Sequence, residues 1–213
     1  MQSLPTIGAM PSSVTDEIAA AAARWVVDEG MEYGPAKHKA RKSLRGPGER
    51  SAGRAELPAN EQVEHQVREY IALFHADTQP QELQALRRIA LRWMERLAEF
   101  RPYVGGAVWR GTATRLSAVH LALYCDDPKS AEIALLNQGI DFDSGSLTDP
   151  RGGEIAVLSL ADRGAELDEP VTLHLMVYDH DDLRGALKPD AQGRSWRGDA
   201  TALRRLLDEE MAG

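Results

Sequence analysis

The sequence has very little cysteine and no long apolar run. Cys125 is the single cysteine in 213 residues, so the chain cannot form an internal disulfide or supply a multi-thiolate zinc site. The longest apolar stretches, at 18–23 and 155–161, are far shorter than the roughly 20 residues needed to span a bilayer. Residues 1–17 contain no Lys or Arg, whereas a secretory signal begins with a basic segment. We therefore expect a cytoplasmic protein with no membrane partner.

The chain also lacks an excess of positive charge. It has 25 Lys and Arg residues against 33 Asp and Glu residues, which gives a formal net charge of -8. This balance disfavours a dedicated DNA-binding protein, because such proteins need a positive field to bind backbone phosphates. The charge is uneven: residues 31–54 carry seven basic and two acidic side chains, and residues 126–170 carry three basic and eleven acidic ones. We expect no nucleic-acid partner except through the basic segment 37–54, which is either an arm that contacts RNA or another acidic surface, or a solvated loop.

Several well-known catalytic motifs are absent. The sequence contains no GxxxxGK(S/T) phosphate loop, no GxGxxG after a predicted strand, no GxSxG nucleophile elbow and no HExxH helix. Enzymes that depend on these motifs are therefore disfavoured, and the residues identify no cofactor.

The first hundred residues carry helical patterns. A helix begins at Ser13 or Thr15, whose hydroxyl groups can cap it, and ends near Gly30. Between 60 and 97, apolar residues recur twice at helical spacing, which predicts a helical hairpin. The segment 43–58 combines Gly, Pro and basic residues with few large apolar ones, so we predict a mobile linker there.

Beyond Phe100 the pattern changes to strands. Four short runs rich in Val, Ile, Leu and aromatic residues lie between turn residues, at 103–109, 118–125, 154–161 and 171–178. Between the second and third runs, Asp127 and Gly139 bound a predicted helix. Its Ile133 and Leu136 are expected to point inward. Another amphipathic helix follows near the C-terminal end.

These patterns together predict an α+β fold. We expect a helical N-terminal half packed on a small mixed β-sheet, followed by a C-terminal helix. The predicted division is an N-terminal helix and basic linker over 1–58, a helical hairpin over 59–100, and an α+β domain over 101–213.

The segment between the first two predicted strands carries the most specific pattern. It reads GTATRLS, with Gly111 and Thr112 at its start and Ser117 at its end, and the next strand opens with SAVHL. This arrangement resembles the polymerase-beta-like nucleotidyltransferase superfamily, in which a Gly-Ser or Gly-Thr turn opens a short helix and an Asp-x-Asp pair begins the next strand. The resemblance implies a sheet of nucleotidyltransferase type. It also implies that a nucleotide or phosphorylated ligand binds at Gly111, Thr112 and Ser117.

The carboxylates of that superfamily are missing here. Ala118 and His120 occupy the positions of the Asp-x-Asp pair, and His174 is the central polar residue of the strand that would supply the third acid. Magnesium prefers anionic oxygen ligands, so a divalent metal and two-metal catalysis are in doubt. His120 and His174 either replace the acids as a pair that binds a transition metal or a phosphate, or they are hydrogen-bonded strand histidines.

Acidic residues do gather at two strand ends. Asp126 and Asp127 follow the second predicted strand, and Asp179 follows the fourth. These carboxylates either hold a metal in a shifted site or simply cap helices and end strands. Further along, Arg184 and Lys188 lie in a Gly-containing segment, where they either bind phosphate or solubilise a loop.

The chain is also similar to a group of short bacterial proteins labelled UDP-N-acetylmuramate-alanine ligase. ATP-dependent ligases of that kind need a phosphate loop and a much longer chain, so this resemblance implies no ligase activity.

The sequence leaves three functions open. The first is a catalytically degenerate nucleotidyltransferase-like protein that binds a nucleotide or phosphorylated ligand, or has a regulatory role. The second is a structural or regulatory interaction module with a protein partner or a second copy of itself. The third is an active nucleotidyltransferase that uses the shifted acids Asp126, Asp127 and Asp179.

Overall fold

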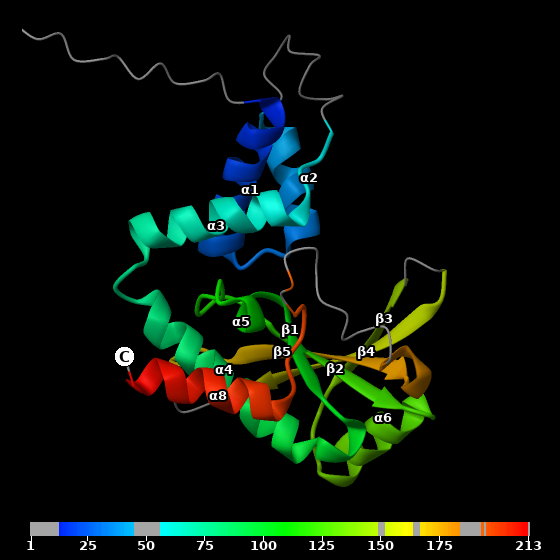
Figure 1. Cartoon of the computed structure of the whole chain (residues 1–213). Coiled ribbons are helices and arrows are strands. Elements are labelled where there is room, and N and C mark those ends of the chain that lie inside the picture. Colours follow the sequence, from blue (N-terminus) through cyan, green and yellow to red (C-terminus); the bar gives the residue numbers. More distant parts are fainter. Residues whose placement is uncertain are drawn as a thin grey trace, which may run out of the picture. The chain divides into compact units, whose positions relative to one another are not determined.

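The computed structural model describes residues 13–44, 56–148, 152–163, 167–183, 193 and 195–212. The chain divides into two compact units, Met1–Phe74 and His75–Gly213, and each has its own apolar core (Figure 1). The boundary falls within the segment predicted as a helical hairpin, so the two helices of that segment belong to different units. In the part of the chain that is described, no helix is both long enough and apolar enough to cross a membrane.

The first unit consists of three helices. They are α1 (Val14–Glu29), α2 (Tyr33–Ser43) and α3 (Asn60–Phe74). As predicted, Ser13 caps α1: its hydroxyl accepts a hydrogen bond from the backbone N–H of Asp16, and the Asp16 carboxylate accepts one from the backbone N–H of Ser13. Gly30 ends α1 in the left-handed conformation, with a φ of 64°.

The sequence patterns do not predict α2. This helix has few large apolar residues, but Ala36 and Ala40 lie one turn apart and are completely buried in the core that α2 shares with α1. Small side chains at this spacing allow the two helices to approach closely, which compensates for the polar character of the remaining surface. Of the predicted linker at 43–58, residues 45–55 lie outside the described part of the chain.

The second unit contains one sheet and several helices. Its strands are β1 (Tyr103–Gly105), β2 (Val119–Cys125), β3 (Asp143–Thr148), β4 (Glu154–Asp162) and β5 (Val171–Asp179). Its helices are α4 (Gln79–Arg96), η1 (Ala98–Phe100), α5 (Gly106–Arg110), α6 (Pro128–Asn137), η2 (His180–Asp182) and α8 (Ala200–Ala212). The strand order is β1-β2-β5-β4-β3; β2 and β5 are parallel, and the other neighbours are antiparallel. The predicted α+β class with a mixed sheet and a C-terminal helix is confirmed.

One face of the sheet lies against α4, α6 and α8 (Figure 1). Leu121 of β2 and Leu173 and Leu175 of β5 are completely buried on this face. They share one core with Leu86 of α4 and Leu203 of α8. Because side chains alternate along a strand, the intervening residues of β2 and β5 lie on the opposite face.

Two elements at the ends of the sheet differ from the sequence-based expectation. The strand predicted over 103–109 ends at Gly105, because Gly106 adopts a φ of 62° and the chain turns into the short helix α5. The strand β3 was not predicted, since its sequence DSGSLT has only one large apolar residue. Its strand conformation depends on antiparallel pairing with β4.

The helix α6 has the predicted limits, but a different face is buried. Ile133 and Leu136, expected to point inward, are 52% and 64% exposed, so this prediction was wrong. Ala131 and Leu135 are buried instead. Positions four residues apart therefore make the contact, and the small side chain of Ala131 allows α6 to lie close to its neighbours.

Candidate functional site

A line of cross-strand partners runs over the sheet, with one residue on each strand. Gly105 of β1 pairs with His120 of β2, and His120 pairs with His174 of β5. His174 in turn pairs with Ser159 of β4, and Ser159 pairs with Asp143 of β3. Direct cross-strand partners lie on the same face of a sheet. We call these five residues the histidine row.

The middle of the histidine row is held by direct side-chain contacts. The ring centroids of His120 and His174 are 5.2 Å apart, and the Oγ of Ser159 lies 2.9 Å from Nδ1 of His174. All three residues are half-buried. A Cβ atom on Gly106 would lie 3.4 Å from Cδ2 of His120, so the turn that opens α5 touches the row. Two imidazoles and a hydroxyl thus form one continuous set of polar groups.

A cluster of two tyrosines and an arginine lies beside the row on the same face, with Tyr124 buried and Tyr178 and Arg197 half-buried. The rings of Tyr124 and Tyr178 are stacked at 5.5 Å, and Arg197 donates hydrogen bonds to both hydroxyls, at 3.1 Å for Tyr178. Burial raises the pKa of Tyr124, and the nearby Arg197 charge opposes that shift. A Cβ atom on Gly105 would lie 3.5 Å from Cγ of Arg197. The arginine stem therefore passes Gly105 at the end of the histidine row, and its guanidinium group lies at the two tyrosine hydroxyls.

The predicted ligand residues Gly111, Thr112 and Ser117 lie in the turn after α5. Gly111 ends that helix with a φ of 79°, and Thr112 is only 2% exposed. The hydroxyl of Ser117 accepts a 3.0 Å hydrogen bond from the backbone N–H of Thr114, which closes the turn. The glycine that directly follows the first strand and opens a short helix is Gly106, whereas Gly111 closes this helix.

The turn and α5 are tied to α4 by two buried polar side chains. Nε2 of Gln79 donates a 2.9 Å hydrogen bond to the carbonyl oxygen of Ala113. Nε of Arg87 donates a 3.1 Å hydrogen bond to the carbonyl oxygen of Val108, and its Nη1 pairs with Glu210 of α8. Burial lowers the pKa of Arg87, and the charge of Glu210 opposes the shift. These contacts fix the helix that begins beside the histidine row.

The aspartates at the strand ends act as caps. Asp127 and Asp179 each accept a 2.9 Å hydrogen bond from the backbone N–H two residues further along the chain. Asp179 is also the cross-strand partner of Cys125. Burial raises the pKa of the Cys125 thiol, and the carboxylates of Asp127, Asp126 and Asp179 raise it further. The three aspartates therefore surround one strand end.

Neither the strand-end aspartates nor the histidines form a complete metal site in the part of the structure that is described. No group of three or more His, Cys, Asp or Glu side chains is arranged there to hold a metal ion. Two other predicted ligand residues, Arg184 and Lys188, lie outside the described residues.

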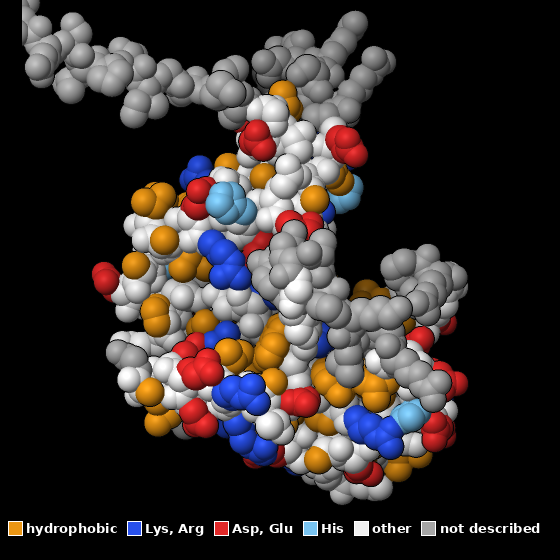
Figure 2. All heavy atoms as spheres, viewed as in Figure 1, with side chains coloured by type: hydrophobic (Ala, Val, Ile, Leu, Met, Phe, Trp, Pro, Cys, Tyr) orange, Lys and Arg blue, Asp and Glu red, His pale blue; other side chains and the backbone are white. Residues whose placement is uncertain are grey.

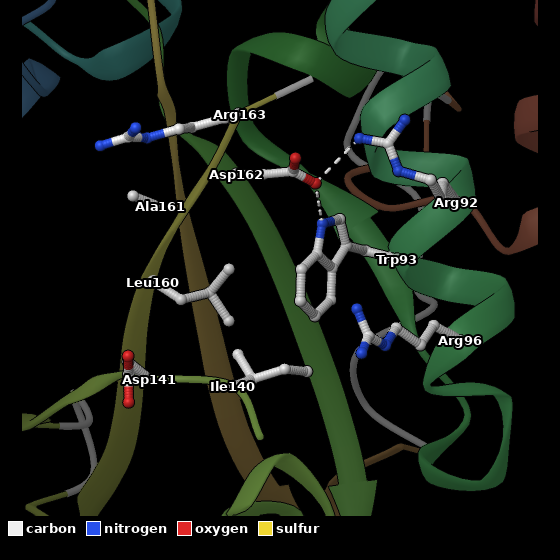
Figure 3. A pocket seen from close by; sticks show the side chains of 9 residues that line it. All are labelled: Arg92, Trp93, Arg96, Ile140, Asp141, Leu160, Ala161, Asp162 and Arg163. Atoms are coloured by element: carbon white, nitrogen blue, oxygen red, sulfur yellow. Dashed lines mark hydrogen bonds and ion pairs between the residues drawn. The ribbon is translucent and has the colours of Figure 1, made fainter. Parts of the chain in front are cut away.

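A separate hollow of about 570 Å³ lies between α4 and β4 (Figure 3). Asp162 in its wall accepts a 2.8 Å hydrogen bond from Nη2 of Arg92 and another from the indole N–H of Trp93. The guanidinium group of Arg96 lies 5.0 Å from the Trp93 ring centroid. Because Asp162 of β4 is bonded to both Arg92 and Trp93, these contacts tie α4 to β4.

Sequence reasoning identified the two histidines but not the rest of the row. Ser159 is the one polar residue of the apolar run IAVLSLA, and His174 is the central polar residue of its own strand. That shared pattern was a usable signal. Asp143 gave no such signal, because its strand lacks an apolar pattern.

No protein-family model matches the chain, and no curated protein matches it. Among solved structures, the chain is similar in part to a crystal structure of the Cid1 poly(U) polymerase with MgGTP bound, with a TM-score of 0.33 and 14% sequence identity. The similarity covers 45% of this chain, and it spans only 32% of the polymerase chain.

Proposed function

We propose that the protein binds a nucleotide or another phosphorylated small molecule at the histidine row and does not catalyse nucleotidyl transfer. The observation that carries this proposal is the contact between His120 and His174 beside the Gly106 turn. The resemblance of the GTATRLS and SAVHL segments to the nucleotidyltransferase superfamily is consistent with this choice of ligand.

The chemistry of the row suits a phosphate group. A protonated imidazole donates N–H hydrogen bonds to phosphate oxygens, and the two rings are close enough to bind the same phosphate group. Arg197, whose stem passes Gly105 at the end of the row, adds positive charge to the same face of the sheet, where its two tyrosine partners hold it in place. Glycine at positions 105 and 106 leaves the backbone unobstructed beside His120.

The same residues argue against catalysis of nucleotidyl transfer. Two-metal phosphoryl transfer requires carboxylates that bridge the metal ions, and Ala118 and His120 stand where the superfamily has them. The aspartates nearest to this strand in sequence, Asp126 and Asp127, follow its far end. The Asp127 carboxylate is already hydrogen-bonded as a helix cap.

Nucleotide titration tests the proposal. Melting temperature and calorimetric binding should be measured with ATP, GTP, CTP, UTP and inorganic phosphate, with and without magnesium. We expect at least one ligand to raise the melting temperature of the wild-type protein without magnesium. His120→Ala and His174→Ala should each lose this effect, whereas His65→Ala, at an exposed position on α3, should retain it. The proposal fails if no ligand binds, or if both row variants bind as well as the wild type.

A further inference from the structure

Helix α2 presents a dense group of cations, Lys37, Lys39, Arg41 and Lys42, which we call the basic face of α2. None of them forms an ion pair with an Asp or Glu side chain among the described residues. Nζ of Lys37 donates hydrogen bonds to the Pro58 carbonyl oxygen and to Oδ1 of Asn60, at 3.1 Å and 2.8 Å. Nζ of Lys39 lies 3.6 Å from the ring centroid of Trp25, on α1. Among the described residues, no carboxylate therefore pairs with the positive charge of this face.

Several cations elsewhere in this acidic chain are paired with carboxylates. Arg68 pairs with Glu64, Arg115 with Glu169, Lys129 with Glu132, and Arg204 with Glu95. Figure 2 shows basic and acidic side chains interspersed over the visible surface of the second unit. On α2, by contrast, like charges lie one turn apart at positions 37 and 41, and 39 and 42, where they repel each other. In a chain with a net charge of -8, a helix whose cations repel one another is suited to binding an anionic partner, because such a partner would relieve the repulsion.

The composition of the basic face of α2 favours a polyanion over a protein surface. Protein interfaces have an apolar or aromatic centre and are depleted in lysine. The apolar residues Ala36 and Ala40 of α2 are buried inside the unit, so the exposed side chains of α2 are mainly Lys, Arg and His. An acidic protein or a second copy of this chain would find little apolar surface there.

The dimensions of α2 and the neighbouring aromatic residue suit a nucleic-acid strand. A helix of 11 residues is about 16 Å long, which corresponds to about five phosphates at 3.4 Å per nucleotide in a stacked strand. Half-buried Trp25 lies beside Lys39, and surfaces that bind single strands combine cations with aromatic rings.

We infer that the basic face of α2 binds single-stranded nucleic acid through its phosphates, without reading the base sequence. This binding surface lies in the first unit and is independent of the histidine row in the second. A variant that loses binding at one of these two surfaces can therefore still be tested for binding at the other.

Fluorescence anisotropy with a labelled 12-nucleotide RNA and a DNA of the same sequence tests this inference at several salt concentrations. Each phosphate contact adds about -0.7 to the slope of log K against log salt for single strands, so three contacts should weaken binding about 20-fold between 50 and 200 mM salt. The triple variant K39Q/R41Q/K42Q should bind about 100-fold more weakly at 0.1 M salt, with a slope closer to zero by about 2. Equal binding of RNA and DNA is expected, because phosphates supply the contacts.

The matched control is the triple variant R115Q/K129Q/R204Q, which changes the net charge by the same amount at paired sites of the second unit. It should bind the oligonucleotides as the wild type does, and circular dichroism should show the same helix content in all three proteins. Equal weakening by both triple variants would overturn the inference, as would the absence of salt-dependent binding to either oligonucleotide. Sedimentation that shows self-association of the wild type, lost only in the α2 variant, would identify a second copy as the partner and also overturn it.

Discussion

His120 and His174 are direct partners on the parallel strands β2 and β5, and their rings lie 5.2 Å apart with an interplanar angle of 34°. This relationship follows from the strand order, which places β5 immediately beside β2 although the two strands are far apart in the sequence. As a result, two histidines that are far apart in the sequence form one polar surface. Ser159 and Gly106 extend this surface on either side.

Ser159→Ala should weaken ligand binding at the histidine row. The substitution removes the hydrogen-bonding partner of Nδ1 of His174, and a single hydrogen bond contributes about 1 kcal/mol, so affinity should fall about fivefold. Calorimetric titration with whichever nucleotide binds the wild type measures this change. Ser144→Ala, at an exposed position on β3, is the control and should leave affinity unchanged. Equal affinities for wild type and Ser159→Ala would show that His174 needs no support from this hydroxyl.

Arg87→Ala should lower the free energy of unfolding by about 3 kcal/mol. The buried guanidinium group joins the Val108 carbonyl and the Glu210 carboxylate, and removing one partner of a buried pair leaves the others unsatisfied. Urea denaturation followed by circular dichroism measures the loss. Arg88→Ala, at the exposed position next in the sequence, should cost about 0.5 kcal/mol or less. Similar losses for the two variants would contradict the structural role of Arg87.

Leu135→Ala and Leu136→Ala should differ sharply in stability. Leu135 is completely buried, and truncating a buried leucine costs about 2 to 5 kcal/mol, whereas Leu136 is 64% exposed and should cost about 0.5 kcal/mol or less. Denaturation of both variants under identical conditions tests which face of α6 packs in the core. A larger loss of stability in Leu136→Ala than in Leu135→Ala would show that α6 packs through the face that the sequence pattern predicted.

The Cys125 thiol should react slowly with iodoacetamide near pH 8. Burial and the three neighbouring aspartates raise its pKa above the usual value of 9.0, so the reactive thiolate is scarce. Asp126→Asn removes one of these charges and should increase the alkylation rate, whereas Asp208→Asn on α8 should not. Since the folded-state pKa is raised, the associated stabilisation is complete below the unfolded pKa and is lost as pH rises through the folded value. An unchanged rate in Asp126→Asn would mean that burial alone protects the thiol.

Elements with clear end signals were predicted from the sequence. The Ser13 cap, the Gly30 end, and the Asp127 start of α6 are set by neighbouring residues, so local patterns are sufficient to identify them. By contrast, α2 and β3 depend on contacts with α1 and β4 that a local pattern does not contain. The buried face of α6 was missed for a related reason, because a small residue, Ala131, makes the contact that was assigned to larger ones.

The candidate site was only partly accessible to sequence reasoning. His120 stood out because it occupies the second position of the Asp-x-Asp pattern, and His174 because it is the central polar residue of an apolar strand. Their direct pairing and the addition of Ser159 depend on strand order and register, which arise from the packing of the whole sheet. The role expected for Gly111 rested on motif spacing, whereas the position of Gly106 beside His120 depends on where β1 ends.

NMR titration of the histidine rings tests the proposed function most directly. The ring resonances of His120 and His174, assigned with the single alanine variants, should be followed during addition of ATP and of inorganic phosphate at constant pH. The proposal predicts that both sets of resonances shift in a saturable way, while those of His65 on α3 in the first unit remain in place. Unchanged resonances for both row histidines at saturating nucleotide and phosphate would contradict it.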